Sequence, residues 1–207
     1  MQLIDTHCHL NDPKFSRDWQ EAVTRATAAG VDTLVVVGYD LDSSRAALRL
    51  AHEHTAILAA VGIHPHDAKS TNADSLRQVA DLAVDPRVVA IGESGLDFHR
   101  DLSPRDVQRR AFTDFIKLAA DIDKPLIVHS RDADEEVLEV LAETLSEGQR
   151  VVRHCFAGGP ETVGAYAELG CHIGIAATIT YPTASDVRAA AAAAPAHLIV
   201  LETDCPW

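Results

Sequence analysis

Several features that mark other protein classes are scarce or missing in this chain of 207 residues. It has four cysteines and no C-x-x-C pair, and a chain of this size does not need disulfides to fold. No run of about 18 apolar residues exists, and the first residues lack the basic segment and apolar stretch of a signal peptide. These absences exclude secreted and membrane-spanning roles, and we expect a cytoplasmic protein.

Positive charge is also scarce. Lysine and arginine total 18 against 31 aspartates and glutamates, which gives a formal net charge of −13. A broad basic surface that grips nucleic-acid phosphates is therefore not expected, and any polyanion must be bound by local charge. Apolar residues make up 47% of the chain, enough for one sizeable core, so we expect a single domain over residues 1–207.

Short β-branched or Leu-rich runs alternate with longer amphipathic stretches along the whole chain, as in βα units around a parallel sheet. Eight strands are predicted, at 3–7, 33–38, 57–63, 88–93, 126–130, 151–156, 172–176 and 198–204. Their ends recur about every 28 residues, which favours an α/β fold of the TIM-like (β/α)8 barrel type. One intervening helix is expected to begin with Ser103 as its N-cap and Pro104 at its first position.

The sequence stops directly after the eighth predicted strand. A complete barrel has a further helix over the junction of strands eight and one, so we expect a barrel that lacks its C-terminal covering helix. A monomer is expected, or an oligomer if a partner covers that junction.

Histidines and carboxylates fall at the predicted strand ends. His7 and His9 end the first strand, and their spacing of two residues points both rings to one face. The later strands end in four further candidates, namely Glu93, His129, His154 and Asp204. Each follows by two positions a residue expected to face the barrel interior, namely Ile91, Ile127, Val152 and Glu202.

These six side chains should meet at the carboxyl-terminal rim of the barrel, where the active sites of such folds lie. Four imidazoles and two carboxylates would repel one another or stay unpaired there unless cations lie between them. Two divalent cations are the simplest solution, with Glu93 as the bridging carboxylate. The pattern leaves the metal open among Mg, Mn and Zn, because His and carboxylate ligands accept all three.

Other residues near the rim are expected to support this site. Asp5 and Glu202 are candidates to orient the ligands from a second layer. His64 and Arg131 are candidates for binding substrate, whereas His66 is expected to face solvent. Three cysteines lie next to proposed ligands and should turn to the opposite face as packing residues, namely Cys8, Cys155 and Cys205.

At these residues the sequence closely resembles the TatD family of metal-dependent hydrolases, within the amidohydrolase-like barrels. The matching segments are 4–9 (IDTHCH), 62–66 (GIHPH), 92–97 (GESGLD), 129–131 (HSR), 154–156 (HCF) and 202–207 (ETDCPW). The resemblance implies a two-metal hydrolase of phosphodiesters that acts on DNA or RNA from the 3′ end. It also implies a first metal on His7, His9, Glu93 and Asp204, and a second on Glu93, His129 and His154.

We therefore expect a metal-dependent phosphodiesterase in which Glu93 and Asp204 are catalytic, with Asp204 as proton acceptor. Two alternatives remain at this point. One is a binuclear amidohydrolase acting on an amide or ester such as an aminoacyl ester, although such barrels often bridge their metals with a lysine where this chain has Glu93. The other is a truncated metal-binding remnant without activity.

Overall fold

The structure is a computed structural model that describes residues 2–207 of the chain. Within these residues, strands and α-helices alternate along the whole chain. The strands are β1 (Leu3–Cys8), β2 (Val31–Val37), β3 (Ile57–Val61), β4 (Val88–Asp97), β5 (Leu126–Arg131), β6 (Val151–Arg153), β7 (His172–Ile175) and β8 (Ile199–Leu201). The α-helices are α1 (Trp19–Ala28), α2 (Leu41–Glu53), α3 (Ala73–Ala83), α4 (Arg105–Asp121), α5 (Asp134–Thr144), α6 (Pro160–Glu168) and α7 (Ser185–Ala193). Short 3-10 helices occupy Pro13–Phe15, Pro65–Ser70, Ala177–Thr180 and Ala196–Leu198.

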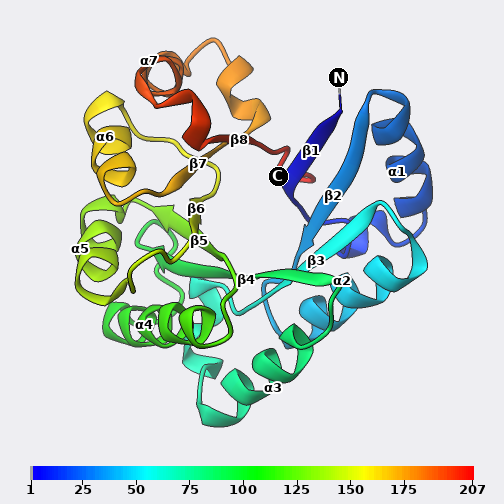
Figure 1. Cartoon of the computed structure of the whole chain (residues 1–207), viewed down its shortest axis with the longest axis horizontal. Coiled ribbons are helices and arrows are strands. Elements are labelled where there is room, and N and C mark those ends of the chain that lie inside the picture. The colour runs from blue at the N-terminus through cyan, green and yellow to red at the C-terminus, as the bar shows by residue number, and fades with distance from the viewer. Residues whose placement is uncertain (1) are drawn as a thin grey trace.

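All neighbouring strands pair in parallel, in the order β1 to β8. Figure 1 shows the helices around the outside of the strands, as expected when each helix returns the chain to the start of the next strand. The TIM-like (β/α)8 barrel predicted from the strand spacing is confirmed. Three strand ends differ most from the prediction, because β4 continues to Asp97, β6 ends at Arg153 and β8 ends at Leu201.

The junction between β8 and β1 is held by individual hydrogen bonds. The Asp204 backbone N–H donates to the carbonyl of His7 at 2.9 Å, and the His9 N–H donates to the carbonyl of Cys205 at 2.8 Å. Figure 1 shows the C-terminus beside β1 accordingly. The segment after β8 therefore lies against the end of β1.

The outer side of this junction is uncovered in the part of the chain that the structure describes. No helix follows β8 within residues 2–207. The side chains of Ile4 and Leu201 are consequently half exposed, at 54% and 50%. Among the helices of residues 2–207, none combines the length and the apolar character that a membrane crossing needs.

Alternation along the strands divides the core into two parts. A small cluster lies inside the barrel and contains Val35, Val37, Ala60, Ala90 and Ile127. A larger cluster lies between strands and helices. Helix α4 contributes Phe112, Phe115, Ile116 and Ala119 to it, a spacing of one buried helical face.

The start of α4 differs from the prediction. Pro104 is the N-cap and the helix begins at Arg105, so Ser103 is not the capping residue. The Ser103 hydroxyl instead donates to the carbonyl of His66 at 2.7 Å. Ser103 therefore connects α4 to the loop after β3 rather than satisfying the first turn of the helix.

Gly95 is needed where β4 passes β5, because it has a φ of +149° and a Cβ there would collide with the His129 carbonyl oxygen. We expect Gly95→Ala to lower the free energy of unfolding by about 2 kcal/mol or more, measured by chemical denaturation. Gly164→Ala is the control, because nothing lies within 4 Å of a Cβ built at that position in α6. It should be neutral or stabilising by about 0.5–1 kcal/mol. Equal stability of the two variants would contradict this packing.

Candidate metal centre

The six predicted ligands all lie at the carboxyl ends of strands. His7 is in β1, Glu93 in β4 and His129 in β5. His9, His154 and Asp204 follow directly after β1, β6 and β8, within one to three residues. All are buried except His129 and Asp204, whose side chains are 15% and 17% exposed. The structure therefore brings the six residues to one end of the barrel.

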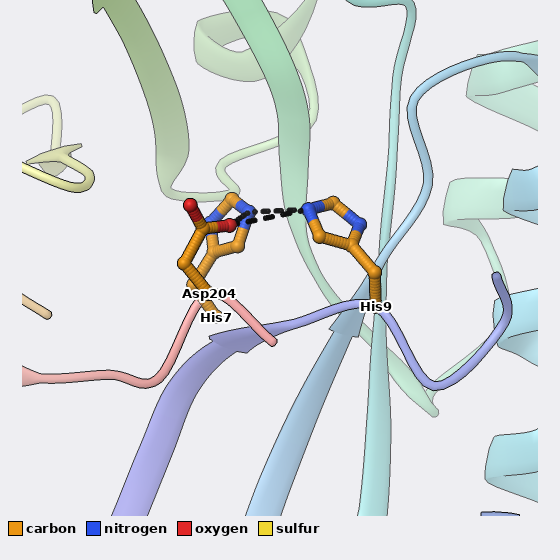
Figure 2. A group of neighbouring side chains, drawn as sticks. All are labelled: His7, His9 and Asp204. Carbon is orange, nitrogen blue, oxygen red and sulfur yellow. Dashed lines mark hydrogen bonds and ion pairs between the residues drawn. The ribbon is translucent and has the colours of Figure 1, made fainter. Parts of the chain in front are cut away.

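His7, His9 and Asp204 form the first group of side chains. Their Nε2 atoms and the Asp204 carboxylate point toward one another, as Figure 2 shows. The Nε2 atoms of His7 and His9 lie 3.1 Å apart. Asp204 Oδ1 lies 3.5 Å from His9 Nε2 and 3.8 Å from His7 Nε2. His9 Nδ1 lies 2.9 Å from the Val37 carbonyl, to which it donates, so its Nε2 lone pair faces the group.

Glu93 lies between this group and a second one. Its Oε2 atom is 3.4 Å from His7 Nε2, whereas its Oε1 atom is 2.7 Å from His129 Nδ1 and 2.8 Å from His154 Nε2. Each carboxylate oxygen thus faces a different pair of histidines. This is the arrangement a carboxylate needs to contact two cations at once.

Glu93 reaches the interior by a route that strict alternation does not predict. The expectation that Ile91 faces inward is wrong, because Ala90 belongs to the interior cluster and Ile91 to the core between strands and helices. The pairing of β4 with β5 shifts register between Ile91 and Ser94, and this irregularity turns Glu93 inward. The Glu93 N–H then donates to the carbonyl of Gly38 at 3.1 Å.

His64, a predicted substrate-binding residue, lies in direct contact with the cluster of predicted ligands. Its Nε2 atom is 3.3 Å from His129 Nδ1 and 3.6 Å from Glu93 Oε1, and its side chain is only 12% exposed. These three residues are close enough to share one cation. His64, predicted to bind substrate, therefore lies directly beside two of the predicted metal ligands.

A family model described as TatD related DNase matches residues 4–207. The chain belongs to this family. It is 36% identical over 205 residues to "Uncharacterized metal-dependent hydrolase YabD" of Bacillus subtilis (strain 168), across 99% of this chain and 80% of that protein. It is 34% identical over 206 residues to "3'-5' ssDNA/RNA exonuclease TatD" of Escherichia coli (strain K12), across 99% and 79%. The crystal structure of YJJV, a TatD homolog from Escherichia coli K12, superposes with a TM-score of 0.92 at 34% identity, across 99% and 79%.

The two predicted supporting carboxylates in this TatD-family chain contact different parts of the cluster. Asp5 accepts from the backbone N–H of His7 at 3.2 Å and from the Thr203 hydroxyl at 2.6 Å, so it holds the main chain rather than the imidazole of His7. Glu202 faces His154, with Oε1 at 3.5 Å from Nδ1. Glu202 therefore contacts a histidine of the second group.

Sequence reasoning missed Asp97 and misplaced His66. His66 is not turned to solvent, because its Nε2 atom lies 2.8 Å from Asp97 Oδ2 and its side chain is 28% exposed. Asp97 Oδ2 also lies 3.3 Å from His129 Nε2. Asp97 is the last residue of the GESGLD segment, four residues after Glu93. The predicted strand ends at Glu93, so strand position does not identify Asp97 as a site residue.

The remaining predicted residues lie outside the cluster. Arg131 ends β5 with an exposed side chain. Cys8 packs in the core between strands and helices, as predicted, and Cys205 packs against that core. Cys155 is half-buried. No cysteine belongs to a possible metal-binding group within residues 2–207.

The charges of the cluster are mutually dependent. Burial alone would raise the pKa of Glu93, but the charges of His154 and His64 hold it well below its usual value. Burial alone would lower the pKa of His154, but Glu93 and Glu202 hold it well above its usual value. Glu93 and His154 thus favour each other's charged forms.

The donor set fits divalent metal. Imidazole nitrogens and carboxylate oxygens converge from several strands, and two buried imidazole Nε2 atoms only 3.1 Å apart repel each other unless a proton or a cation lies between them. His7 Nδ1 has no hydrogen-bond partner, so this ring is not engaged in a structural hydrogen-bond network through that atom. Clusters of this TatD-family chain are therefore able to bind metal.

We expect Zn²⁺ or Mn²⁺ to raise the melting temperature, because a ligand at about 100 times its Kd stabilises by about 2.7 kcal/mol. The shift should be larger at about pH 8 than at about pH 6, because the cation must displace the proton that the raised pKa of His154 retains. Differential scanning fluorimetry measures both effects.

Glu93→Gln should abolish most of this stabilisation, whereas Glu53→Gln, at an exposed position near the end of α2, should keep it. A melting temperature that metal leaves unchanged in the unmodified protein, or raises equally in Glu93→Gln, would contradict the site.

Proposed function

We propose that this chain is a metal-dependent hydrolase that removes nucleotides from the 3′ ends of single-stranded DNA or RNA with two divalent cations, Mg, Mn or Zn. The observation that carries this proposal is the position of Glu93, with one carboxylate oxygen on each of two histidine groups. Support also comes from the relatives, of which several at 34–36% identity bear the name 3'-5' ssDNA/RNA exonuclease TatD.

Two overlapping sets of side chains would hold the cations. The first set is His7, His9, Glu93 and Asp204, and the second is Glu93, His129 and His154. Divalent cations in such a site neutralise charge on phosphoryl oxygens and activate water for in-line attack. Glu93, as the shared member, would fix the separation of the two cations.

Asp204 would accept the proton of the attacking water at its carboxylate. Burial alone would raise its pKa, but the hydrogen bond from His9 and the charges of His154 and His7 lower it, so the carboxylate is ionised near neutral pH. Its side chain remains 17% exposed, which leaves access from solvent. Asp204 is positioned for this role by the hydrogen bond of its N–H to the His7 carbonyl.

His64 and Arg131 would bind the phosphate next to the scissile bond. His64 Nε2 lies against Glu93 and His129, so it can donate to a phosphoryl oxygen beside the second set. Arg131 brings positive charge from the end of β5. Because the chain carries a net charge of −13, binding depends on this local charge, and frayed or single-stranded ends should be better substrates than duplex.

The test is release of nucleotides from a labelled single-stranded oligonucleotide with a free 3′ end, with Mg²⁺, Mn²⁺, Zn²⁺ or EDTA. We expect metal-dependent shortening from the 3′ end, and at least about a 100-fold loss of rate in Glu93→Ala, because both cations lose a shared ligand. Glu53→Gln should retain the full rate.

The opposite results are informative as well. No cleavage by folded, metal-loaded protein would contradict the nuclease proposal, and cleavage of an aminoacyl ester by the same sample would favour an amidohydrolase. Retention of more than a few per cent of the rate in Glu93→Ala would contradict the role of Glu93.

A further inference from the structure

Asp97 ends β4 as a buried carboxylate with several partners. Its Oδ1 atom accepts from the backbone N–H groups of His99 at 3.0 Å and Arg100 at 2.7 Å. Its Oδ2 atom lies 2.8 Å from His66 Nε2 and 3.3 Å from His129 Nε2. The side chain is only 1% exposed. A carboxylate with this many donors around it is held as an anion in one orientation.

The surroundings fix Asp97 further. Its backbone N–H donates to Gln108 Oε1 at 2.8 Å, and Gln108 Nε2 donates to the carbonyls of Asp97 and Ser103 at 3.3 and 2.7 Å. Gln108 is completely buried in α4. Because the Ser103 hydroxyl holds the His66 carbonyl, the loop carrying His66 is connected to the same helix. Helix α4 thus holds both Asp97 and its histidine partner in place.

The two ring nitrogens of His129 face opposite partners. Nδ1 lies 2.7 Å from Glu93 Oε1, on the side of the proposed second cation, and Nε2 lies toward Asp97. An imidazole that ligates metal through Nδ1 must carry its proton on Nε2. Asp97 Oδ2 is the acceptor in reach of that proton. A carboxylate in this position fixes the tautomer and ring orientation and makes the ligating nitrogen a better donor.

We propose that Asp97, anchored by His66, is a positioning residue that holds His129 in the Nε2–H tautomer with Nδ1 directed at the second cation. This inference rests on the proposed function only in requiring a cation between Glu93, His129 and His154. Glu202 has the corresponding place beside His154. The two histidines of the second set are thereby each backed by a carboxylate.

A third cation held by His64, His66 and Asp97 is the competing interpretation, since ligand atoms of these residues lie within 4.8 Å of one another. The orientation of His64 argues against it. His64 accepts the His66 backbone N–H at Nδ1, and its Nε2 faces Glu93 and His129 instead.

The decisive experiment is titration of the metal-free protein with Mn²⁺ or Zn²⁺ by calorimetry, in the unmodified protein and Asp97→Asn. Asparagine keeps the size of the side chain and removes its charge. We expect two cations per chain, one of which binds about 10–100-fold more weakly in Asp97→Asn while the other is unchanged. Asp85→Asn is the matched control, because Asp85 pairs with His52 at the same 2.8 Å on the surface. It should leave both affinities unchanged.

Two further measurements separate positioning from a merely structural role. His66→Ala should weaken the same cation to a smaller extent, and His66→Gln, which retains a donor, should recover part of that loss. Imidazole ¹⁵N spectra of the metal-loaded protein should show His129 protonated at Nε2. This measurement remains decisive if Asp97→Asn does not fold.

Several results would overturn the proposal. In calorimetry these are equal metal affinities of Asp97→Asn and the unmodified protein, fewer than two bound cations, or a third bound cation that His66→Ala removes. In the ¹⁵N spectra it is a His129 proton on Nδ1. All readouts are independent of cleavage. A protein that releases no nucleotides but loses one cation site selectively in Asp97→Asn would contradict the proposed function and support the positioning role.

Discussion

The buried negative charge of Glu93 is the constraint on which the site depends. A carboxylate with only 3% of its surface exposed is costly unless positive charge surrounds it, and here histidines from four separate segments lie around it. Glu93 and Glu202 in turn raise the pKa of His154, which favours its protonated form. Divalent cations can replace such protons with more charge and fixed geometry, so one electrostatic requirement underlies the cluster and its proposed chemistry.

The fold meets this requirement at two irregular places. The register shift in β4 turns Glu93 into the barrel, and the hydrogen bonds between the chain after β8 and the end of β1 bring Asp204 beside His7. Both places depart from a regular parallel ladder, and both carry proposed ligands. Regular strands form the scaffold, whereas these two local deviations orient the side chains of Glu93 and Asp204.

Much of this architecture could be predicted from the sequence. Strand spacing predicts the barrel and places His7, His9, His129 and His154 at strand ends. Alternation along the strands then predicts that these side chains share one face. The prediction for Glu93 depends on the incorrect premise that Ile91 faces the barrel interior. Ile91 faces the helices, and regular alternation from it would turn Glu93 toward the helices as well. The contact between Asp97 and His66 could not be predicted from the sequence. It depends on where β4 ends and on how the loop after β3 folds back, and neither of these two features has a local sequence signal.

Glu93 is proposed to lie between two cations. Anomalous diffraction from crystals of this chain grown with Mn²⁺ or Zn²⁺ would locate both cations. We predict two anomalous peaks, one beside Glu93 Oε2 near His7 and His9, and one beside Glu93 Oε1 near His129 and His154. A single peak, or peaks that leave the Glu93 carboxylate without a metal on both sides, would contradict it.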